Sequence, residues 1–229
     1  MRERMHTADL VDVFAAWRAT FAAQRDALIA LDGKVGDSDL GITMNKAFGA
    51  ASDAAAAAAT EPPAKLLQRA GMAIAKAAPS TMGTLTATGF MRGAKALAEA
   101  PDNGAGAGLG TTEWALFWTA YHQGVAERGK ARPGDKTVLD VLGPLAASLQ
   151  TSAAAGIALP EALAQATQAA VLALEATKGM VAQHGKAACF QEKSLGLQDA
   201  GGTVAWLLID TLHLVSATPP ATPPTTPHV

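Results

Sequence analysis

Residues 8–30 read ADLVDVFAAWRATFAAQRDALIA, and this stretch sets the pattern for the whole chain. Leu10, Val13, Phe14 and Trp17 follow the i, i+3, i+4, i+7 spacing of one helix face, and Phe21 continues it. Eight of the other positions are alanine, the residue with the highest helix propensity. The stretch therefore predicts a slender helix with one apolar face.

The composition of the full chain extends this prediction to an all-α fold. Of 229 residues, 54 are alanine, whereas β-branched and aromatic residues are sparse and scattered. A hydrophobic content of 49% with 17% charged residues excludes global disorder. We expect one helical domain over residues 1–216, followed by a disordered Pro/Thr-rich tail at 217–229.

Charge and cysteine content exclude several classes of protein. A net charge of −2 gives no general attraction to nucleic acid or to an anionic membrane. No run approaches the roughly 20 apolar residues that span a bilayer. A single cysteine excludes a disulfide framework. We therefore expect a soluble cytoplasmic protein without nucleic-acid or membrane partners.

Turn and capping signals divide the domain into eight predicted helices. They cover 8–30, 41–58, 64–78, a segment capped by Ser80 or Thr81 and ending near 100, a segment capped by Thr111 or Thr112, a segment from Asp135 to 152, 160–183, and a last helix after 202. Short connections favour an antiparallel bundle or barrel. The polar loops at 32–41, 80–83, 129–136 and 185–202 follow alternate helices, so all four are predicted to gather at one end.

The loop LDGKVGDSDLG at 31–41 is the most informative of these segments. Asp32, Asp37 and Asp39 place three carboxylates within eight residues, and such neighbours repel one another unless a cation lies among them. Hard oxygen ligands suit Mg²⁺ or Ca²⁺, and the spacing does not fit an EF-hand. We favour Mg²⁺; the alternative is a solvated acidic turn.

The three other loops suit phosphates or a nucleotide. Ser80, Thr81, Met82 and Gly83 lie where a helix begins, so free N–H groups would face an anion. Residues 129–137 carry the cations Lys130, Arg132 and Lys136, and the last loop carries Lys186 and ends in Asp199-Ala200-Gly201-Gly202. Each is alternatively an ordinary cap or turn. Together, opposite the carboxylates, they indicate a magnesium–nucleotide site.

The same four segments, in the same order, resemble the L subunit, or C-terminal nucleotide-binding domain, of dihydroxyacetone kinases. The resemblance spans about residues 8–215, and the segments are LDGKVGDSDLG at 31–41, STMGTL at 80–85, RGKARPGDKTVLD at 128–140 and GKAACFQEKSLGLQDAGG at 185–202. It implies an eight-helix antiparallel barrel whose mouth binds two Mg²⁺ ions and ADP or ATP.

The resemblance also implies roles for individual residues. Asp32, Asp37 and Asp39 correspond to the metal ligands and, with Lys186, to the catalytic groups. The residues that correspond to nucleotide contacts are Leu40, Gly41, Ile42, Thr43, Ser80, Thr81, Met82, Gly83, Gly129, Val138, Lys186, Asp199, Ala200 and Gly201.

In this family a different subunit or domain holds the sugar. The resemblance therefore implies a phosphoryl-delivering kinase subunit with a sugar-binding partner. The phosphoryl donor is either free ATP or a phosphohistidine protein of the sugar phosphotransferase system. Two alternatives stay open: a kinase half for another small sugar or hydroxyacid, and a nucleotide-gated interaction protein without catalysis.

Overall fold

The computed structural model describes residues 1–100 and 108–218. Within these residues nine α-helices and two 3₁₀ segments form the structure, and the only β-pairing is an isolated bridge between Met5 and Leu109. The elements are α1 (Thr7–Ala23), α2 (Arg25–Asp32), α3 (Leu40–Ala57), α4 (Pro63–Ala77), α5 (Thr81–Glu99), α6 (Thr111–Gly129), α7 (Leu139–Ala154), α8 (Leu159–Ala176), η1 (Thr177–Gly179), η2 (Lys186–Ser194) and α9 (Ala200–Ala217).

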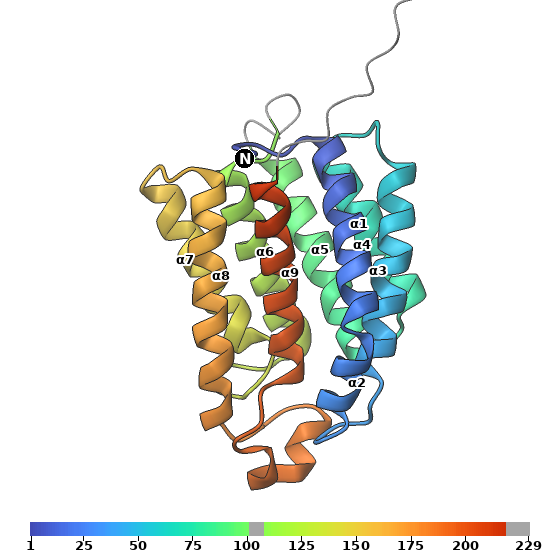
Figure 1. The fold of residues 1–229 in the computed structure, drawn as a ribbon, viewed down its shortest axis with the longest axis vertical. Helices are drawn as coiled ribbons and strands as arrows, with labels where there is room; N and C mark the ends of the chain where they lie inside the picture. The colour runs from blue at the N-terminus through green and yellow to red at the C-terminus, as the bar shows by residue number, and fades with distance from the viewer. Residues whose placement is uncertain (101–107, 219–229) are drawn as a thin grey trace, which may run out of the picture.

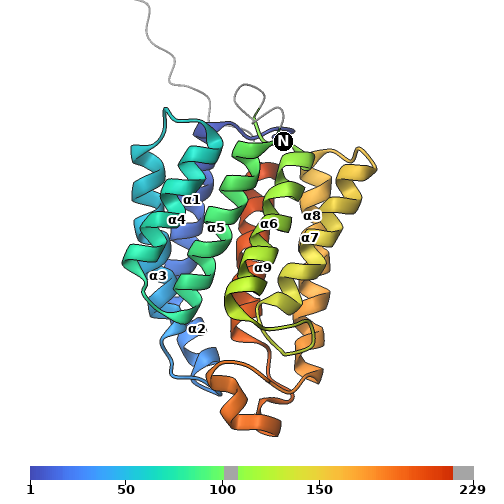
Figure 2. The ribbon, with the colours of Figure 1, turned by 180° about the vertical axis from the view of Figure 1, so that it is seen from behind.

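Eight long helices form a closed antiparallel barrel, which confirms the predicted fold class. Helices α1, α3, α4, α5, α6, α7, α8 and α9 each pack against the next, and α9 packs back against α1 (Figures 1 and 2). The indole N–H of Trp17 on α1 donates to the Leu208 carbonyl of α9 at 2.9 Å, across the closing contact. The short helix α2 continues α1 toward the lower end of Figure 1 and leans on α3.

Aromatic side chains fill the barrel interior. Phe90 of α5 lies at its centre, with its ring centroid 5.6 Å from those of Trp17 and Tyr121 and 5.8 Å from that of Phe117. Glycine allows α5 to approach α6 this closely, because a Cβ at Gly89 would lie 2.4 Å from the Tyr121 ring. The apolar faces predicted from the sequence are therefore the core of the barrel.

Four predicted helix boundaries are wrong. The helix at 8–30 breaks at Gln24 into α1 and α2, and α8 ends at Ala176 instead of 183. Gly110, not Thr111 or Thr112, caps α6, and its N–H donates to the Glu113 carboxylate at 2.7 Å.

The remaining boundary error concerns α7, which begins at Leu139 and not at Asp135. Gly134 and Lys136 have φ angles of +93° and +58°, so the chain cannot be helical there. Asp140 organises this turn instead, because its carboxylate accepts hydrogen bonds from the N–H groups of Gly134 at 2.5 Å and Thr137 at 2.7 Å.

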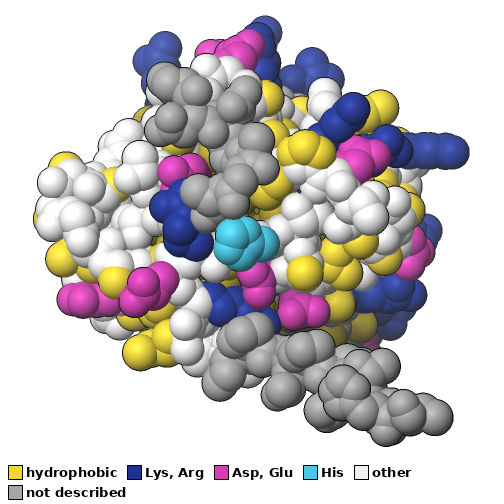
Figure 3. Space-filling view, turned by 90° about the horizontal axis from the view of Figure 1, so that it is seen from above, with side chains coloured by type: hydrophobic (Ala, Val, Ile, Leu, Met, Phe, Trp, Pro, Cys, Tyr) yellow, Lys and Arg dark blue, Asp and Glu magenta, His cyan; other side chains and the backbone are white. Residues whose placement is uncertain are grey.

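The two ends of the barrel differ. The upper end in Figure 1 carries the N-terminal segment, where Arg2 is buried and pairs with Asp9 at 2.9 Å and Asp12 at 3.0 Å. Seen from above, acidic, basic and apolar side chains are interspersed on the described part of this end (Figure 3). The predicted tail lies mostly outside the described residues, although Ala217 closes α9.

Helix α9 is long and apolar enough to cross a membrane by length and composition alone. It forms one wall of the barrel, however, where it packs against α1, α7 and α8. Burial of Val204, Leu208 and Leu212 marks it as a core helix.

Candidate functional site

The four polar loops meet at the lower end of the barrel in Figures 1 and 2, as the alternation of helices predicts. They surround an open cavity of about 480 Å³. Its walls come from the α2–α3 loop, the start of α5, the α6–α7 loop and the segment before α9.

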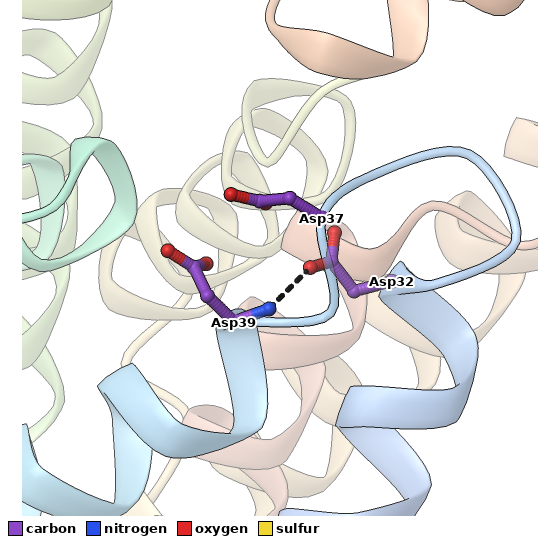
Figure 4. Close-up of side chains that lie close together, drawn as sticks. All are labelled: Asp32, Asp37 and Asp39. Carbon is purple, nitrogen blue, oxygen red and sulfur yellow. Dashed lines mark hydrogen bonds between the residues drawn. The ribbon is translucent and has the colours of Figure 1, made fainter.

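The acidic trio lies on one wall of this cavity. Asp32 ends α2, Asp39 precedes α3, and Asp37 lies between them in the loop (Figure 4). One carboxylate oxygen from each lies within 4.8 Å of the other two. Asp32 is partly buried, whereas Asp37 and Asp39 are exposed to the cavity.

Backbone contacts fix Asp32 in this arrangement. Its Oδ2 atom accepts hydrogen bonds from the N–H groups of Asp39 at 3.1 Å and Leu40 at 3.4 Å. Its Oδ1 atom lies against Gly36, where a Cβ would approach it to 2.2 Å. A side chain at Gly36 would therefore displace the carboxylate, which explains a glycine at this point of the loop.

The donor set fits a divalent cation. Three carboxylates provide hard oxygen ligands, and Asp39 makes no side-chain capping bond that would occupy its oxygens. Their mutual repulsion is relieved in the structure by Lys186, whose ammonium forms an ion pair with Asp37 Oδ2. Few protein ligands beside an open cavity are typical of Mg²⁺, which keeps water and phosphate oxygens in its shell.

The start of α5 lies across the cavity from the acids. Ser80 caps this helix by accepting a hydrogen bond from the Gly83 N–H at 3.1 Å. Thr81 and Met82 line the cavity in the first turn, where backbone N–H groups have no helical partner and favour an anion. Glycine at position 83 allows the helix to begin here, because a Cβ at Gly83 would lie 2.0 Å from the Ala78 carbonyl oxygen.

Between α5 and α6 the cavity wall becomes apolar. Leu85 and Val125 line it, together with Gly129, Val138 and Leu139 around the α6–α7 loop. This lining suits an apolar group better than a charged one. The cavity thus has three parts: an apolar wall, the N-terminus of α5, which favours an anion such as phosphate, and the acidic trio, which favours a cation.

The fourth wall is the segment between η1 and α9. Lys186 and Gly185 line the cavity there, followed by Asp199, Ala200 and Gly201 at the start of α9. The Asp199 carboxylate caps α9 by accepting a hydrogen bond from the Gly202 N–H at 2.5 Å. This segment connects across the cavity mouth to the acidic trio through the Lys186–Asp37 pair.

Comparison with known proteins supplies the family. The family model of the Dak2 domain matches residues 34–214, which is most of the chain. The chain belongs to the Dak2 domain family.

Individual relatives agree with this assignment. The chain is 32% identical over 196 residues to the ADP-binding subunit DhaL of the PEP-dependent dihydroxyacetone kinase of Escherichia coli K12. The alignment covers 86% of this chain and 90% of that subunit. The chain is also 34% identical over 216 residues to the L-erythrulose kinase of Pectobacterium atrosepticum, covering 34% of that enzyme. The dihydroxyacetone kinase of C. freundii, solved with AMP-PNP and Mg²⁺, shares the fold with a TM-score of 0.66 at 23% identity, over 89% of this chain and 33% of that one.

Most of the residues predicted for the site line the cavity of this Dak2 domain. They are Asp32, Asp37, Asp39, Leu40, Ser80, Thr81, Met82, Gly129, Val138, Lys186, Asp199, Ala200 and Gly201. Four others do not line it. Gly41 packs on the Arg25 carbonyl, Thr43 is buried, Ile42 is 39% exposed, and Gly83 packs on Ala78.

Several cavity residues were not assigned individual nucleotide or metal contacts from the sequence, although all except Val125 and His184 lie within the four predicted segments. They are Val35, Gly36, Leu85, Val125, Ala131, Thr137, Leu139, His184, Gly185, Ala187, Cys189 and Gln198. Leu85 and Val125 follow the apolar pattern of their helices, which reads as core. Lys136 was expected to offer its charge to phosphates, but its ammonium is instead bonded to protein carbonyls.

Asp199 has a strongly displaced pKa. Burial raises the pKa of its carboxyl group to about 7; the hydrogen bond from Gly202 and the charge of Lys136 oppose the shift, whereas Asp140 and Asp32 add to it. The folded protein therefore binds a proton that the unfolded chain releases between about pH 4 and pH 7.

This displacement predicts a pH-dependent loss of stability in the ligand-free Dak2 domain. Because the folded-state pKa is raised, the free energy of unfolding falls as pH rises from about 4 to about 7, by up to a few kcal/mol. Asp199→Asn keeps the capping oxygen and removes the titration. Urea unfolding of both proteins across this range is expected to show the wild type losing stability relative to the variant. A constant difference would contradict the raised pKa.

Proposed function

We propose that this Dak2 domain binds a magnesium–adenine nucleotide and is the phosphoryl-delivering subunit of a kinase for dihydroxyacetone or a similar small hydroxyketone. The observation that carries the proposal is the single cavity that joins the acidic trio, the N-terminus of α5 and an apolar wall. These three parts match the metal, the phosphates and the base of a nucleotide, respectively.

The names of the relatives support the choice of ligand and reaction. An ADP-binding subunit of a dihydroxyacetone kinase matches nearly end to end, and a structure with the same fold contains AMP-PNP and Mg²⁺. We propose ADP or ATP as the nucleotide and two Mg²⁺ ions as the metal complement, with Asp32, Asp37 and Asp39 as the metal ligands.

Phosphoryl transfer requires positioning and charge neutralisation more than a protein nucleophile. Bound Mg²⁺ would neutralise phosphate oxygens and polarise the transferred group. Asp32 is held by two backbone N–H groups, so it orients the metal site. Asp39 and the Asp37 carboxylate, whose Oδ2 pairs with Lys186, would supply the other metal ligands. The first turn of α5 binds phosphate oxygens through N–H groups, and Lys186 supplies a positive charge from the opposite wall.

A separate sugar-binding subunit is part of the proposal. The Dak2 domain spans nine-tenths of the E. coli ADP-binding subunit but only about a third of the L-erythrulose kinase and of the C. freundii kinase. We infer from the similarity to relatives named as ADP-binding subunits that the sugar is held by a partner subunit, and that the complex works in the cytoplasm. The donor is either ATP or a phosphohistidine protein, since related subunits belong to kinases named PEP-dependent and PTS-dependent.

Other relatives favour a different sugar as the phosphoryl acceptor. Matches to an L-erythrulose kinase at 34% identity and a D-erythrulose kinase at 32% identity make a four-carbon ketose an alternative acceptor. Assays with dihydroxyacetone and both erythrulose enantiomers, each with the cognate sugar-binding subunit, distinguish these substrates.

The division of labour predicts that the isolated chain does not phosphorylate free dihydroxyacetone. Without a partner that holds the sugar in line, the large proximity contribution to the rate is lost. Product formation from ATP or from a phosphohistidine donor is expected only after the sugar-binding subunit is added. Steady phosphorylation by the purified chain alone would refute the proposal, and Mg–ADP binding without transfer in any complex would favour a nucleotide-gated interaction protein.

A further inference from the structure

Lys136 is a buried cation in the loop between α6 and α7. Only 3% of its surface is exposed. Its Nζ atom donates hydrogen bonds to the backbone carbonyl oxygens of Ser194 at 2.5 Å, Leu197 at 2.7 Å and Met180 at 3.1 Å. A lysine ammonium has three N–H donors, so these three acceptors use all of them.

All three carbonyls belong to residues 180–199, which we call the roof segment. It contains η2, and Gly185, Lys186, Ala187 and Cys189 within it line the cavity. Lys136 contacts the segment near its start and twice near its end, so it holds together two parts of the segment that are far apart in sequence.

The roof segment has few other ties to the α6–α7 loop. The Asp135 carbonyl accepts a hydrogen bond from the Gln183 N–H at 2.9 Å, and the Asp135 carboxylate lies 3.0 Å from His184 Nε2. The His184 and Asp135 side chains are 40% and 21% exposed, so this ion pair is screened by solvent. Lys136 is thus the buried centre of the contact.

We propose that Lys136 is a positioning residue for the nucleotide site, whose ammonium gathers three roof-segment carbonyls and thereby holds Lys186 over the acidic trio. This inference rests on the proposed function, because Lys186 matters only if a nucleotide phosphate binds there. Lys136 acts through the backbone of the roof segment.

The chemistry of the site requires a lysine. A methionine of similar length would leave three carbonyl oxygens without their donor, and unsatisfied buried carbonyls favour opening toward water. An arginine fork is planar and cannot direct its N–H groups to three acceptors around one atom. Burial lowers the pKa of Lys136, but the charge of Asp199 opposes that shift.

The direct test compares Lys136→Met with Lys193→Met, a matched control that removes an exposed lysine of the roof segment itself. Hydrogen exchange of the ligand-free proteins is expected to be at least about 10-fold faster at roof-segment amides in Lys136→Met, with α5 and α6 unchanged. Mg–ADP is expected to dissociate at least about 10-fold faster from this variant. Lys193→Met is expected to match the wild type in both measurements.

A double-mutant cycle tests the route through Lys186. If Lys136 acts by positioning Lys186, then Lys136→Met in a Lys186→Met background is expected to accelerate Mg–ADP dissociation much less than it does alone. Fully multiplicative effects would overturn the route, and wild-type exchange in the roof segment of Lys136→Met would overturn the anchoring. Faster exchange with unchanged dissociation would overturn the positioning role.

The role of Lys136 can be tested even if the wild type does not bind Mg–ADP or the Lys136→Met variant does not fold. If the wild type does not bind Mg–ADP, the proposed function fails, while the exchange comparison still decides whether Lys136 anchors the roof segment. If Lys136→Met does not fold, acetic anhydride labelling of the wild type provides the test. Lys136 is then expected to react at least about 10-fold more slowly than Lys193, and equal reactivity would overturn the proposal.

Discussion

Replacing Asp37 or Asp39 with asparagine is expected to weaken Mg–ADP binding by at least about 100-fold. Loss of an outer-shell partner alone costs 10- to 100-fold in metal affinity, so the loss of a ligand is expected to cost more. Both side chains are exposed to the cavity, and neither is part of the barrel core. Helicity and melting temperature are therefore expected to stay at the wild-type values, and calorimetric titration measures the loss.

Asp26 offers a matched control for this experiment. It lies in the first turn of α2, the helix that ends at Asp32, its side chain is 86% exposed, and its ion pair with Arg25 is a surface contact. Asp26→Asn is expected to bind Mg–ADP as the wild type does. Unchanged affinity in both Asp37→Asn and Asp39→Asn would remove the acidic trio from the metal site.

Replacing Gly41 with alanine is expected to cause a large loss of stability, of about 3 kcal/mol or more. A Cβ at this position would lie 2.0 Å from the Arg25 carbonyl oxygen and 2.9 Å from the Ile29 side chain. Backbone atoms cannot move aside as a side-chain end can, so α2 and α3 would have to separate. The acidic loop connects these two helices, and Mg–ADP binding is expected to fall with stability.

Gly49 lies in the same helix and provides the opposite expectation. No atom lies within 4 Å of a Cβ built there, and alanine favours a helix interior over glycine by about 0.5–1 kcal/mol. Gly49→Ala is therefore expected to raise the melting temperature, whereas Gly41→Ala lowers it. A Gly41→Ala protein as stable as the wild type would show that α2 and α3 are not packed as closely as described.

The sequence predicts the fold well because its apolar spacing is long and regular. Trp17, Phe48, Phe90 and Phe117 recur on helical faces, and they are the aromatic residues that fill the barrel. The break at Gln24 has no signal in the sequence, since neither glycine nor proline marks it. It depends on the packing of α2 against α3, which is a tertiary contact.

In the candidate site, too, local sequence predicts some features, whereas others depend on tertiary contacts. The acidic trio is local in sequence, and the alternation of loops places the other polar segments beside it, so both features can be predicted. Lys136 cannot be assigned from local sequence, because its acceptors lie 44 to 61 residues away. Leu85 and Val125 likewise become cavity residues only because of where α5 begins and α6 ends relative to the loops.

The most direct test of the magnesium–nucleotide site is a crystal structure of the chain with ADP and MnCl₂, analysed by the anomalous scattering of manganese. Mn²⁺ accepts the same oxygen ligands as Mg²⁺ and can be located without reference to the protein density. We predict two manganese peaks within coordination distance of Asp32, Asp37 and Asp39, with ADP phosphates between them and the first turn of α5. Manganese at another place, or ADP bound away from this cavity, would contradict the account.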